Sequence, residues 1–327
     1  MNSVSLAMVS YREDRPRWEE EGRDWPHRGA SRFVTASGLS WHLQEMGPAG
    51  APQLLLVHGT GAATHSWRGL MPRLAERFRV IAPDLPGHGF TDPLPDRRLS
   101  LPGMAGALTD LVRALGSDPA VVVGHSAGAA ILARACLDGG FAPRLLVALN
   151  GALKPFPGMA GLVFPGMARM LFLNPVTSRI FAWSVDRAAV ERLIRGTGSR
   201  LDGQGLDLYR RLFRKPAHIA GALGMMANWN LDALDRDLAG LGLRTLLVVG
   251  GEDRAILPET AFAVRDRLPD ARVELLRGLG HLAHEEAPER VADTILREAA
   301  VVGILPPEHP RNRRRTATGP ALPGKHD

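Results

Sequence analysis

Short apolar runs alternate with stretches of helical spacing along most of this 327-residue chain. The apolar runs have the length of buried strands, and the stretches between them repeat apolar residues every three or four positions. Strands that alternate with helices form βαβ units, so an α/β fold with a mostly parallel sheet is predicted. The predicted strands are Leu39–Met46, Gln53–Val57, Arg79–Ala82, Val121–Val123, Arg144–Leu149, Arg244–Val249 and Arg272–Leu276; the predicted helices are Trp67–Phe78, Ser100–Leu115, Ala127–Leu137 and Pro288–Ala299.

Two of these elements carry a more detailed prediction. Leu39–Met46 alternates apolar and polar residues, which is typical of a strand at the edge of a sheet. Ser100 stands at the start of its helix, and its side chain is expected to cap the first turn.

The pattern changes after Asn150, and no strand signal appears between residues 151 and 229. This segment is rich in Met, Phe, Trp, Pro and Gly, and it contains helical patterns at Val185–Arg195, Leu206–Phe213 and Ala217–Ala227. A helical insertion into an α/β domain has this character. The expected organisation is an N-terminal extension (1–30), a core in two parts (31–150 and 230–302), a helical cap or lid (151–229) and a disordered basic tail (303–327).

One stretch carries a recognisable chemical motif. Residues Gly124-His125-Ser126-Ala127-Gly128 follow an apolar strand and match the G-x-S-x-G nucleophile elbow. Glycines two positions either side of the serine let the backbone pass close by without a Cβ atom. The following helix favours negative charge at its N-terminus. Ser126 is therefore the predicted nucleophile.

A serine hydroxyl needs a general base, and the base needs an acid to orient it. Asp253 follows the strand Arg244–Val249, and His281 follows the strand that ends at Leu276. Parallel strands put their C-terminal ends at one edge of the sheet, so Ser126, Asp253 and His281 are expected on the same rim. They form the predicted catalytic triad of a serine hydrolase.

Three neighbouring residues are alternatives for the acid or the base. Glu252 adjoins Asp253, and His284 lies three residues beyond His281. His284 ranks lower because His281 directly follows a Gly-x-Gly turn. The end of the strand before the insertion could also hold the acid, but Asn150 stands there and carries no charge.

Acyl transfer also requires N–H donors for the oxyanion. Ala127, the residue after the nucleophile, supplies one candidate, and the turn after the strand Gln53–Val57 supplies the other, with Thr60 preferred over Gly61. His58 either packs under this turn or faces the pocket. The candidate residues of the substrate pocket are His58, Trp67, His125, Phe156, Met225 and Trp229.

Charge and composition exclude several function classes. The formal charge is +6, and the tail from Pro306 contributes five Lys or Arg against two acids. No nucleic-acid-binding module is visible, so no nucleic-acid partner is expected. The sequence shows neither a metal-ligand cluster nor a phosphate-binding G-x-x-x-x-G-K-[ST] loop, so no metal site and no cofactor are expected. The single cysteine, Cys136, is predicted to be a small buried hydrophobe and suits a reducing, cytoplasmic compartment.

Together the motifs resemble the α/β-hydrolase superfamily with a helical cap, over residues 33–300. The resemblance rests on His58-Gly59, Asp84–Gly89, Gly124–Gly128, Asp253 and Gly280-His281. It implies an α/β-hydrolase fold, with a mostly parallel central sheet flanked by helices. It also implies two-step hydrolysis, for which an ester is the expected bond.

A closer resemblance is to the magnesium-chelatase accessory proteins of bacteriochlorophyll biosynthesis, which are α/β-hydrolases. It implies a place in the pigment pathway of phototrophic bacteria, and transient association with magnesium chelatase or with a membrane surface. The apolar insertion suits a large apolar substrate, such as a tetrapyrrole ester. The alternatives are a non-catalytic tetrapyrrole-binding accessory protein and a general carboxylesterase unrelated to pigment. The matching runs are His58–Trp67, Gly124–Arg134, Leu149–Leu153, Met225–Trp229, Gly22–Pro26 and Ala30–Phe33.

Overall fold

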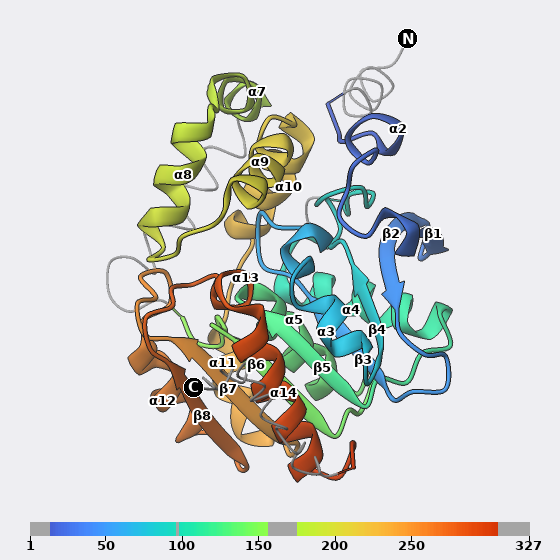
Figure 1. Cartoon of the computed structure of the whole chain (residues 1–327), viewed down its shortest axis with the longest axis vertical. Coiled ribbons are helices and arrows are strands. Elements are labelled where there is room, and N and C mark those ends of the chain that lie inside the picture. The colour runs from blue at the N-terminus through green and yellow to red at the C-terminus, as the bar shows by residue number, and fades with distance from the viewer. Residues whose placement is uncertain (1–13, 96–97, 156–174, 307–327) are drawn as a thin grey trace, which may run out of the picture.

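The structure is a computed structural model that describes residues 14–95, 98–155 and 175–306 (Figure 1). Its centre is an eight-stranded sheet with the order β1-β2-β4-β3-β5-β6-β7-β8. The pairs β1/β2 and β2/β4 are antiparallel, and all other neighbours are parallel, which confirms the predicted fold class. The strands are β1 (Ser31–Ala36), β2 (Leu39–Met46), β3 (Gln53–Val57), β4 (Arg79–Pro83), β5 (Val121–His125), β6 (Leu145–Leu149), β7 (Arg244–Gly250) and β8 (Ala271–Leu276).

The edge of the sheet differs from the prediction. β1 forms the edge, and the sequence does not reveal it because its adjacent residues Arg32 and Phe33 are both exposed. β2 is therefore the second strand, and its central residues Trp41 to Gln44 are all buried. Trp41 belongs to a core cluster with residues of α4 (Leu101–Ala114). The alternate side chains of β2 contact the N-terminal segment: His42 packs against Trp18, and Gln44 donates to Pro26 O. The outward positions of β2 are thus covered rather than solvated.

Helices cover both faces of the sheet (Figure 1). Alternate strand side chains point to opposite faces, so Leu55 and Val57 join one core cluster while Leu54 and Leu56 join the other. Strands buried on both faces are apolar at nearly every position, which explains the continuous runs in the sequence. The first face is covered by α4, α5 (Ala127–Leu137) and α12 (Pro258–Arg265), and the second by α3 (Met71–Ala75) and α14 (Pro288–Val301).

Two helix predictions need correction. The expected helix Trp67–Phe78 is a 3-10 turn, Thr64–Trp67, followed by the short helix α3. Pro72 lies in the first turn of α3, where the missing N–H is tolerated, and this fixes the start of the helix. Ser100 occupies the N-cap position of α4, but its side chain makes no capping hydrogen bond.

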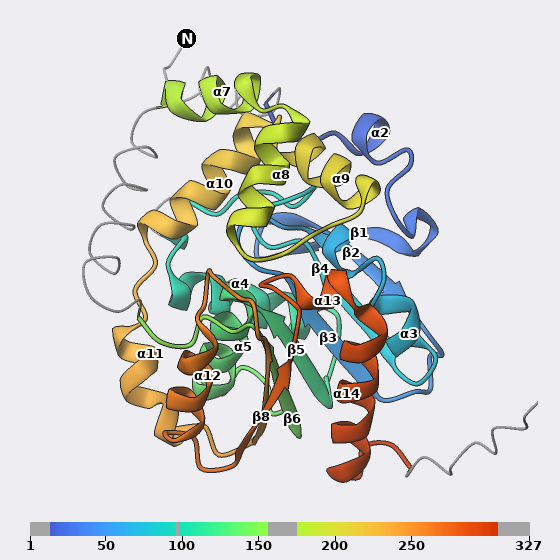
Figure 2. The same ribbon diagram turned by 60° about the vertical axis from the view of Figure 1, so that its left-hand side comes forward.

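Between β6 and β7 the chain leaves the sheet and forms helices above its C-terminal edge (Figure 2). Three of these helices match the helical patterns predicted from sequence. Asp186 and Asp202 cap α8 and α9 by accepting hydrogen bonds from backbone N–H groups. We call α7–α10 the inserted helices. They and the helix that follows are α7 (Pro175–Ser184), α8 (Arg187–Gly196), α9 (Gly203–Phe213), α10 (Pro216–Ala227) and α11 (Asp232–Asp237).

Residues 14–30, here called the N-terminal strap, lie across the core and the inserted helices and contain the short helix α2 (Trp18–Glu21). On the core side, the indole N–H of Trp25 donates to Thr64 Oγ1 (3.0 Å). On the other side, Arg211 of α9 forms two hydrogen bonds with the Asp24 carboxylate (2.7 and 2.9 Å). The strap therefore connects the two parts of the molecule.

Candidate active site

Ser126 lies at the sharp turn between β5 and α5. Its backbone angles, φ 51° and ψ −118°, are ones that non-glycine residues rarely adopt. Hydrogen bonds on both sides hold this turn: Ser126 N–H donates to Leu149 O (3.0 Å), and Ser126 O accepts from Ala129 N–H (3.1 Å) and Ala152 N–H (3.0 Å). Ser126 is partly exposed, whereas the residues on either side of it are buried.

Both glycines of the G-x-S-x-G motif are required by close backbone contacts. A Cβ atom on Gly124 would lie 2.4 Å from Ala129 N, and one on Gly128 would lie 2.2 Å from Val57 O. Neither backbone atom can retreat without moving a strand or a helix. The motif therefore has here the steric basis that the sequence suggests.

Asp253 and His281 meet beyond the C-terminal ends of β7 and β8. His281 Nδ1 lies 2.8 Å from Asp253 Oδ2. A carboxylate only accepts, so Nδ1 carries the proton and Nε2 of the neutral ring keeps its lone pair. Asp253 Oδ1 accepts from the N–H groups of Ala255 (2.8 Å) and Ile256 (2.9 Å), which fixes the carboxylate from its own loop. This arrangement leaves Nε2 as the basic atom of the pair.

Asn150 belongs to this site, although the sequence indicates only that it carries no charge. It follows β6 with φ 46°, is 1% exposed, and donates from Nδ2 to Asp253 Oδ2 (2.7 Å). The same carboxylate oxygen therefore receives one hydrogen bond from Asn150 and one from His281. Its position at the end of a strand was the available signal; its role as a donor to the acid could not be deduced.

The loop after α8 forms hydrogen bonds with both the loop of Asp253 and the loop of His281. Thr197 O accepts from the backbone N–H groups of Arg254 (3.1 Å) and His281 (3.4 Å). Ser199 Oγ accepts from Leu282 N–H (2.7 Å). These contacts join residues far apart in the sequence, and no local pattern marks them. The inserted helices are thereby anchored to the loops that carry Asp253 and His281.

The turn Gly59–Gly61 lies beside Ser126. A Cβ atom on Gly59 would come within 3.0 Å of Ser126 Cβ. The N–H groups of Thr60 and Gly61 donate no hydrogen bond to another described residue. Ala127 is the first residue of α5, where an N–H group has no acceptor within the helix. Within the described ranges, none of the three predicted oxyanion donors gives its N–H to another residue.

The hydroxyl group of Ser126 differs from its backbone in its hydrogen bonding. Among the residues that the structure describes, Ser126 Oγ makes no hydrogen bond, either to His281 or to another group. Catalytic hydrogen bonds are often long without substrate and tighten only in the complex. The structure thus brings Asp253 and His281 together and places Ser126 at the same sheet edge. It shows no hydrogen bond between Ser126 Oγ and His281.

Two predicted pocket residues are packed inside the protein instead. His58 is fully buried under the turn: its Nδ1 donates to Gly59 O (2.8 Å) and its Nε2 accepts from Leu85 N–H (2.8 Å). With both ring nitrogens bonded to backbone, it has none left for a ligand. Trp67 is 0% exposed in the core cluster that packs on α3 and α14. Both side chains stabilise the fold rather than line a pocket.

Two of the other pocket candidates, His125 and Met225, contact predicted site residues. His125 is buried, and its Nε2 donates to His281 O (3.0 Å). Met225 is also buried, and its sulfur accepts from Thr60 Oγ1 (3.6 Å). Trp229 is half-buried against the core. Phe156 lies outside the described residues.

The match to the α/β hydrolase family model extends over residues 54–294. The chain belongs to this family. It is 39% identical over 274 residues to the magnesium-chelatase 30 kDa subunit of Rhodobacter capsulatus, covering 84% of this chain and 95% of that protein. It is 28% identical to the 2-hydroxymuconate semialdehyde hydrolase of Pseudomonas sp. strain CF600, covering 81% of this chain and 92% of that protein. A solved α/β hydrolase fold protein from Burkholderia ambifaria superposes with a TM-score of 0.69 at 25% identity, covering 82% of this chain and 97% of that chain.

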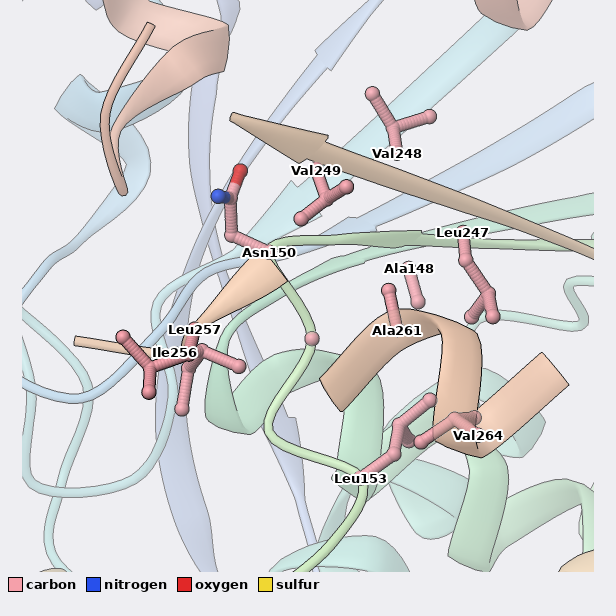
Figure 3. Close-up of a pocket in the computed structure, with 11 residues that line it drawn as sticks. Ala148, Asn150, Leu153, Leu247, Val248, Val249, Ile256, Leu257, Ala261 and Val264 are labelled. Atoms are coloured by element: carbon pink, nitrogen blue, oxygen red, sulfur yellow. The ribbon is translucent and has the colours of Figure 1, made fainter. Parts of the chain in front are cut away.

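In this α/β-hydrolase a small cavity lies behind the acid loop (Figure 3). Its volume is about 10 Å³, roughly the room for one water molecule. Apolar side chains from the ends of β6 and β7 and from α12 line it, and Asn150 borders it. The cavity is too small for a substrate, and of the predicted site residues it includes none.

His284, the alternative base, belongs to a separate buried cluster of this hydrolase. Its Nε2 is 2.7 Å from Ser66 Oγ, and the same hydroxyl donates to Glu285 Oε1 (3.1 Å). Burial lowers the pKa of His284 to about 3 and raises the pKa of Glu285 above its ordinary value. Arg68 and Tyr209 also donate to the Glu285 carboxylate.

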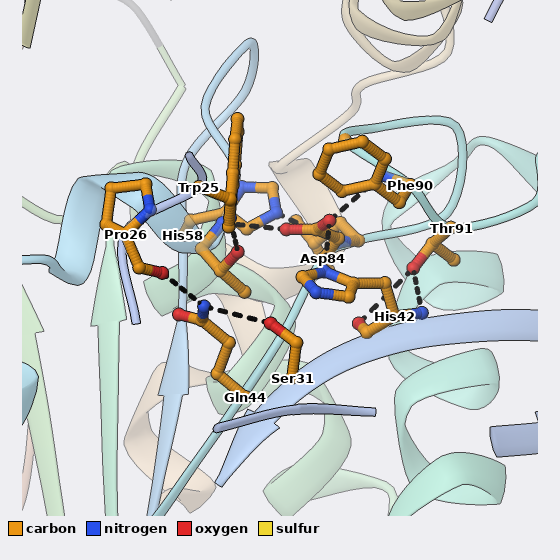
Figure 4. Close-up of polar contacts among 12 residues, drawn as sticks. Trp25, Pro26, Ser31, His42, Gln44, His58, Asp84, Phe90 and Thr91 are labelled. Atoms are coloured by element: carbon orange, nitrogen blue, oxygen red, sulfur yellow. Dashed lines mark hydrogen bonds and ion pairs between the residues drawn. The ribbon is translucent and has the colours of Figure 1, made fainter. Parts of the chain in front are cut away.

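A buried carboxylate, Asp84, organises the turns near the strap (Figure 4). It accepts from His42 Nδ1 (2.7 Å), Thr64 N–H (2.7 Å) and Phe90 N–H (2.9 Å). Burial alone would raise the pKa of Asp84, but the charge and hydrogen bond of His42 lower it well below its ordinary value. Asp84 thus joins β2 to the turns that follow β3 and β4.

Three further observations concern metals, membranes and the cysteine. Within the described ranges no group of three or more His, Cys, Asp or Glu side chains is arranged to hold a metal ion. No helix in those ranges combines the length and apolarity needed to cross a bilayer. Cys136 is half-buried, and burial raises the pKa of its thiol to about 12. The thiol is therefore protonated at neutral pH and a poor nucleophile.

Proposed function

We propose that this α/β-hydrolase is a serine esterase. Ser126 is the nucleophile, His281 the general base, and Asp253 the acid that orients the imidazole. The observation that carries the proposal is the 2.8 Å contact between His281 Nδ1 and Asp253 Oδ2 at the sheet edge that holds Ser126. A histidine bound in this way offers Nε2 to a serine hydroxyl.

In the acylation step, Ser126 Oγ attacks the ester carbonyl carbon while its proton passes to His281 Nε2. The contact between these two side chains closes when substrate is bound. The developing oxyanion accepts hydrogen bonds from Ala127 N–H and Thr60 N–H, with Gly61 N–H as the second choice in that turn. The imidazolium then gives its proton to the leaving oxygen, and the alcohol departs.

In the deacylation step, water attacks the acyl-serine as His281 Nε2 takes one of its protons. The second tetrahedral intermediate collapses, Ser126 Oγ regains the proton, and a carboxylic acid is released. One ester and one water thus become one alcohol and one acid, without a further reactant.

We further propose a role accessory to bacteriochlorophyll biosynthesis, with an apolar substrate such as a tetrapyrrole ester. The support is the 39% identity to a protein named as a magnesium-chelatase subunit. The chain carries no phosphate-binding loop, so we do not assign it the ATP-driven step of chelation. Transient association with the chelatase would bring the hydrolase close to such substrates.

Contact with a membrane surface is part of this proposal. On α7 the side chains of Ile180 (61%), Phe181 (42%) and Trp183 (87%) are exposed, and amphipathic helices with such residues bind lipid interfaces. In a sedimentation assay with vesicles of zwitterionic and anionic lipid, Trp183→Ala should reduce the bound fraction severalfold. Equal binding of the variant and the parent protein would refute the proposed contact between α7 and the membrane.

A non-catalytic tetrapyrrole-binding protein is the second candidate. Two observations favour it: the relative is named for the chelatase rather than for hydrolysis, and Ser126 Oγ is not bonded to His281. A general carboxylesterase is the third, and it predicts turnover of simple esters with no preference for porphyrin esters.

Labelling with a fluorophosphonate probe tests the proposed chemistry. The parent protein should label, Ser126→Ala and His281→Ala should not, and Ser66→Ala should label normally because Ser66 is buried. A control esterase establishes that the probe is active. If the parent protein stays unlabelled while it binds a porphyrin ester, and Ser126→Ala binds equally well, the binding-protein candidate replaces the esterase.

A further inference from the structure

One face of α10 rests on the turns that flank the nucleophile. His218, Gly221 and Met225 are spaced three and four residues apart, so they lie on the same side of the helix. All three are buried. Each contacts a turn that follows a strand of the core, and together they reach both the turn after β3 and the turn after β4.

His218 bonds to both turns at once. Its Nε2 lies 3.0 Å from Gly61 O, and its Nδ1 accepts from Gly89 N–H (3.1 Å). A carbonyl oxygen can only accept and a backbone N–H can only donate, so the ring is neutral with the proton on Nε2. Burial lowers the pKa of His218 to about 4, which keeps it in this form at neutral pH.

The other two residues fix the distance between α10 and the turns. A Cβ atom on Gly221 would lie 2.2 Å from Gly87 O, so the helix touches the second turn backbone to backbone. Met225 Sδ accepts a hydrogen bond from Thr60 Oγ1 (3.6 Å). The residue whose N–H is proposed to bind the oxyanion is therefore held from the same helix face.

We propose that α10 is a fixed wall of the oxyanion hole and that His218 is a positioning residue for the turn Gly59–Gly61. The hydrogen bond to Gly61 O sets the plane of the peptide that follows Gly61. It also prevents the turn from rotating its free N–H groups away from Ser126. This inference rests on the proposed esterase function and adds a part of the inserted helices to its machinery.

The consequence concerns how substrate enters. If α10 lifted away as part of a lid, the buried hydrogen bonds of His218 would break and the turn would lose its support. We therefore infer that α10 stays in place during turnover.

Two amide variants separate the two hydrogen bonds of His218. Glutamine can place an N–H near the position of Nε2 and keep the bond to Gly61 O, whereas asparagine can only replace the acceptor at Nδ1. With a chromogenic ester, His218→Phe and His218→Asn should lower kcat by about 10- to 100-fold with KM nearly unchanged. His218→Gln should restore most of the rate, and the second-order rate of fluorophosphonate labelling should follow kcat.

A matched pair of glycine variants tests the helix position. Gly221→Ala adds a Cβ atom that collides with Gly87 O, whereas Gly106→Ala in α4 adds one that meets nothing within 4 Å. We expect Gly221→Ala to lower kcat about 10-fold and Gly106→Ala to leave it unchanged. Urea unfolding of each variant separates a loss of rate from a loss of folded protein.

Hydrogen exchange provides a readout that needs no activity. In His218→Phe, the peptide that covers residues 59–64 should exchange faster than in the parent protein, and His218→Gln should restore protection. Unchanged exchange in His218→Phe overturns the inference. Faster exchange with unchanged kcat and labelling overturns it as well, because the turn would then move without affecting chemistry. A parent protein that never labels refutes the esterase, while the exchange data still decide whether α10 holds the turn.

Discussion

The protein contains two groups of serine, histidine and carboxylate whose histidines are three residues apart, and the two groups are hydrogen-bonded differently. In one group His281 binds its acid through Nδ1, which leaves Nε2 for the partly exposed Ser126. In the other group His284 Nε2 already contacts Ser66, which is 0% exposed. The same residue types thus leave the serine partly exposed in one place and form a fully buried cluster in the other.

The acids show the difference most clearly. Asp253 contacts the imidazole directly, whereas Glu285 contacts Ser66, Arg68 and Tyr209. An acid that touches the ring fixes its tautomer and stabilises the imidazolium. An acid turned away from the ring cannot do so, and burial keeps the pKa of His284 near 3. A catalytic assignment therefore depends on which atoms meet, not on which residues are near.

The two serines provide the largest contrast. Ser126→Ala should lower kcat/KM for an activated ester by at least about 10,000-fold, since it removes the proposed nucleophile. Ser66→Ala should change it less than about threefold, but should lower the free energy of unfolding by about 1 to 3 kcal/mol because His284 and Glu285 lose a buried partner. Ester kinetics and urea unfolding measure both. A large rate loss in Ser66→Ala would show that the closed cluster contributes to chemistry.

The two acids come next. Asp253→Asn should lower kcat by about 1,000- to 10,000-fold, because the amide no longer selects the productive tautomer of His281. Glu285→Gln should leave kcat within about threefold and cost about 3 kcal/mol of stability, since Arg68 loses a buried charge partner. Steady-state kinetics and denaturant titration of both variants provide the test. Similar rate losses in the two variants would contradict the comparison.

Asn150 tests how the carboxylate of Asp253 is held. Asn150→Ala removes one donor from Asp253 Oδ2 while it leaves the contact with His281 in place. Hydrogen bonds to charged groups are worth about 1.5 to 3 kcal/mol, so kcat should fall about 10- to 100-fold. An unchanged kcat would mean that the backbone donors of Ala255 and Ile256 suffice to hold the acid.

The smallest effect concerns pH. His284 has a pKa of about 3 in the folded protein and 6.5 when unfolded, so its contribution to stability is complete above pH 6.5 and is lost as the pH falls towards 3. Over that window each such histidine adds about 1.4 kcal/mol per pH unit to the slope of stability against pH. In urea titrations between pH 4.5 and 6, His284→Asn should reduce the slope by that amount. Ser66→Ala, which retains the histidine, should keep the parent slope.

The sequence predicts what local patterns control. The elbow at Ser126, the strands β3, β5, β6 and β7 and three of the inserted helices depend on periodicity, glycine and chain order, which neighbouring residues encode. Asp253 and His281 could be chosen because each follows a strand, and the structure places them in contact.

What the sequence could not predict depends on contacts between distant segments. β1 shows no alternation because Arg32 and Phe33 are both exposed. Trp67 and His58 lie close in sequence to the predicted oxyanion turn, but both side chains are buried in the interior. Asn150 and His218 form hydrogen bonds with partners more than a hundred residues away along the chain, and contacts at such separations leave no periodic trace in the sequence.

The N-terminal strap has a consequence for the order in which the chain can fold. Asp24 is synthesised 187 residues before its partner Arg211. The strap therefore cannot make this contact until the inserted helices have been synthesised. Its docking closes a very long loop between the core and the inserted helices, so the contacts of the strap with α9 form late relative to the synthesis of the strap itself.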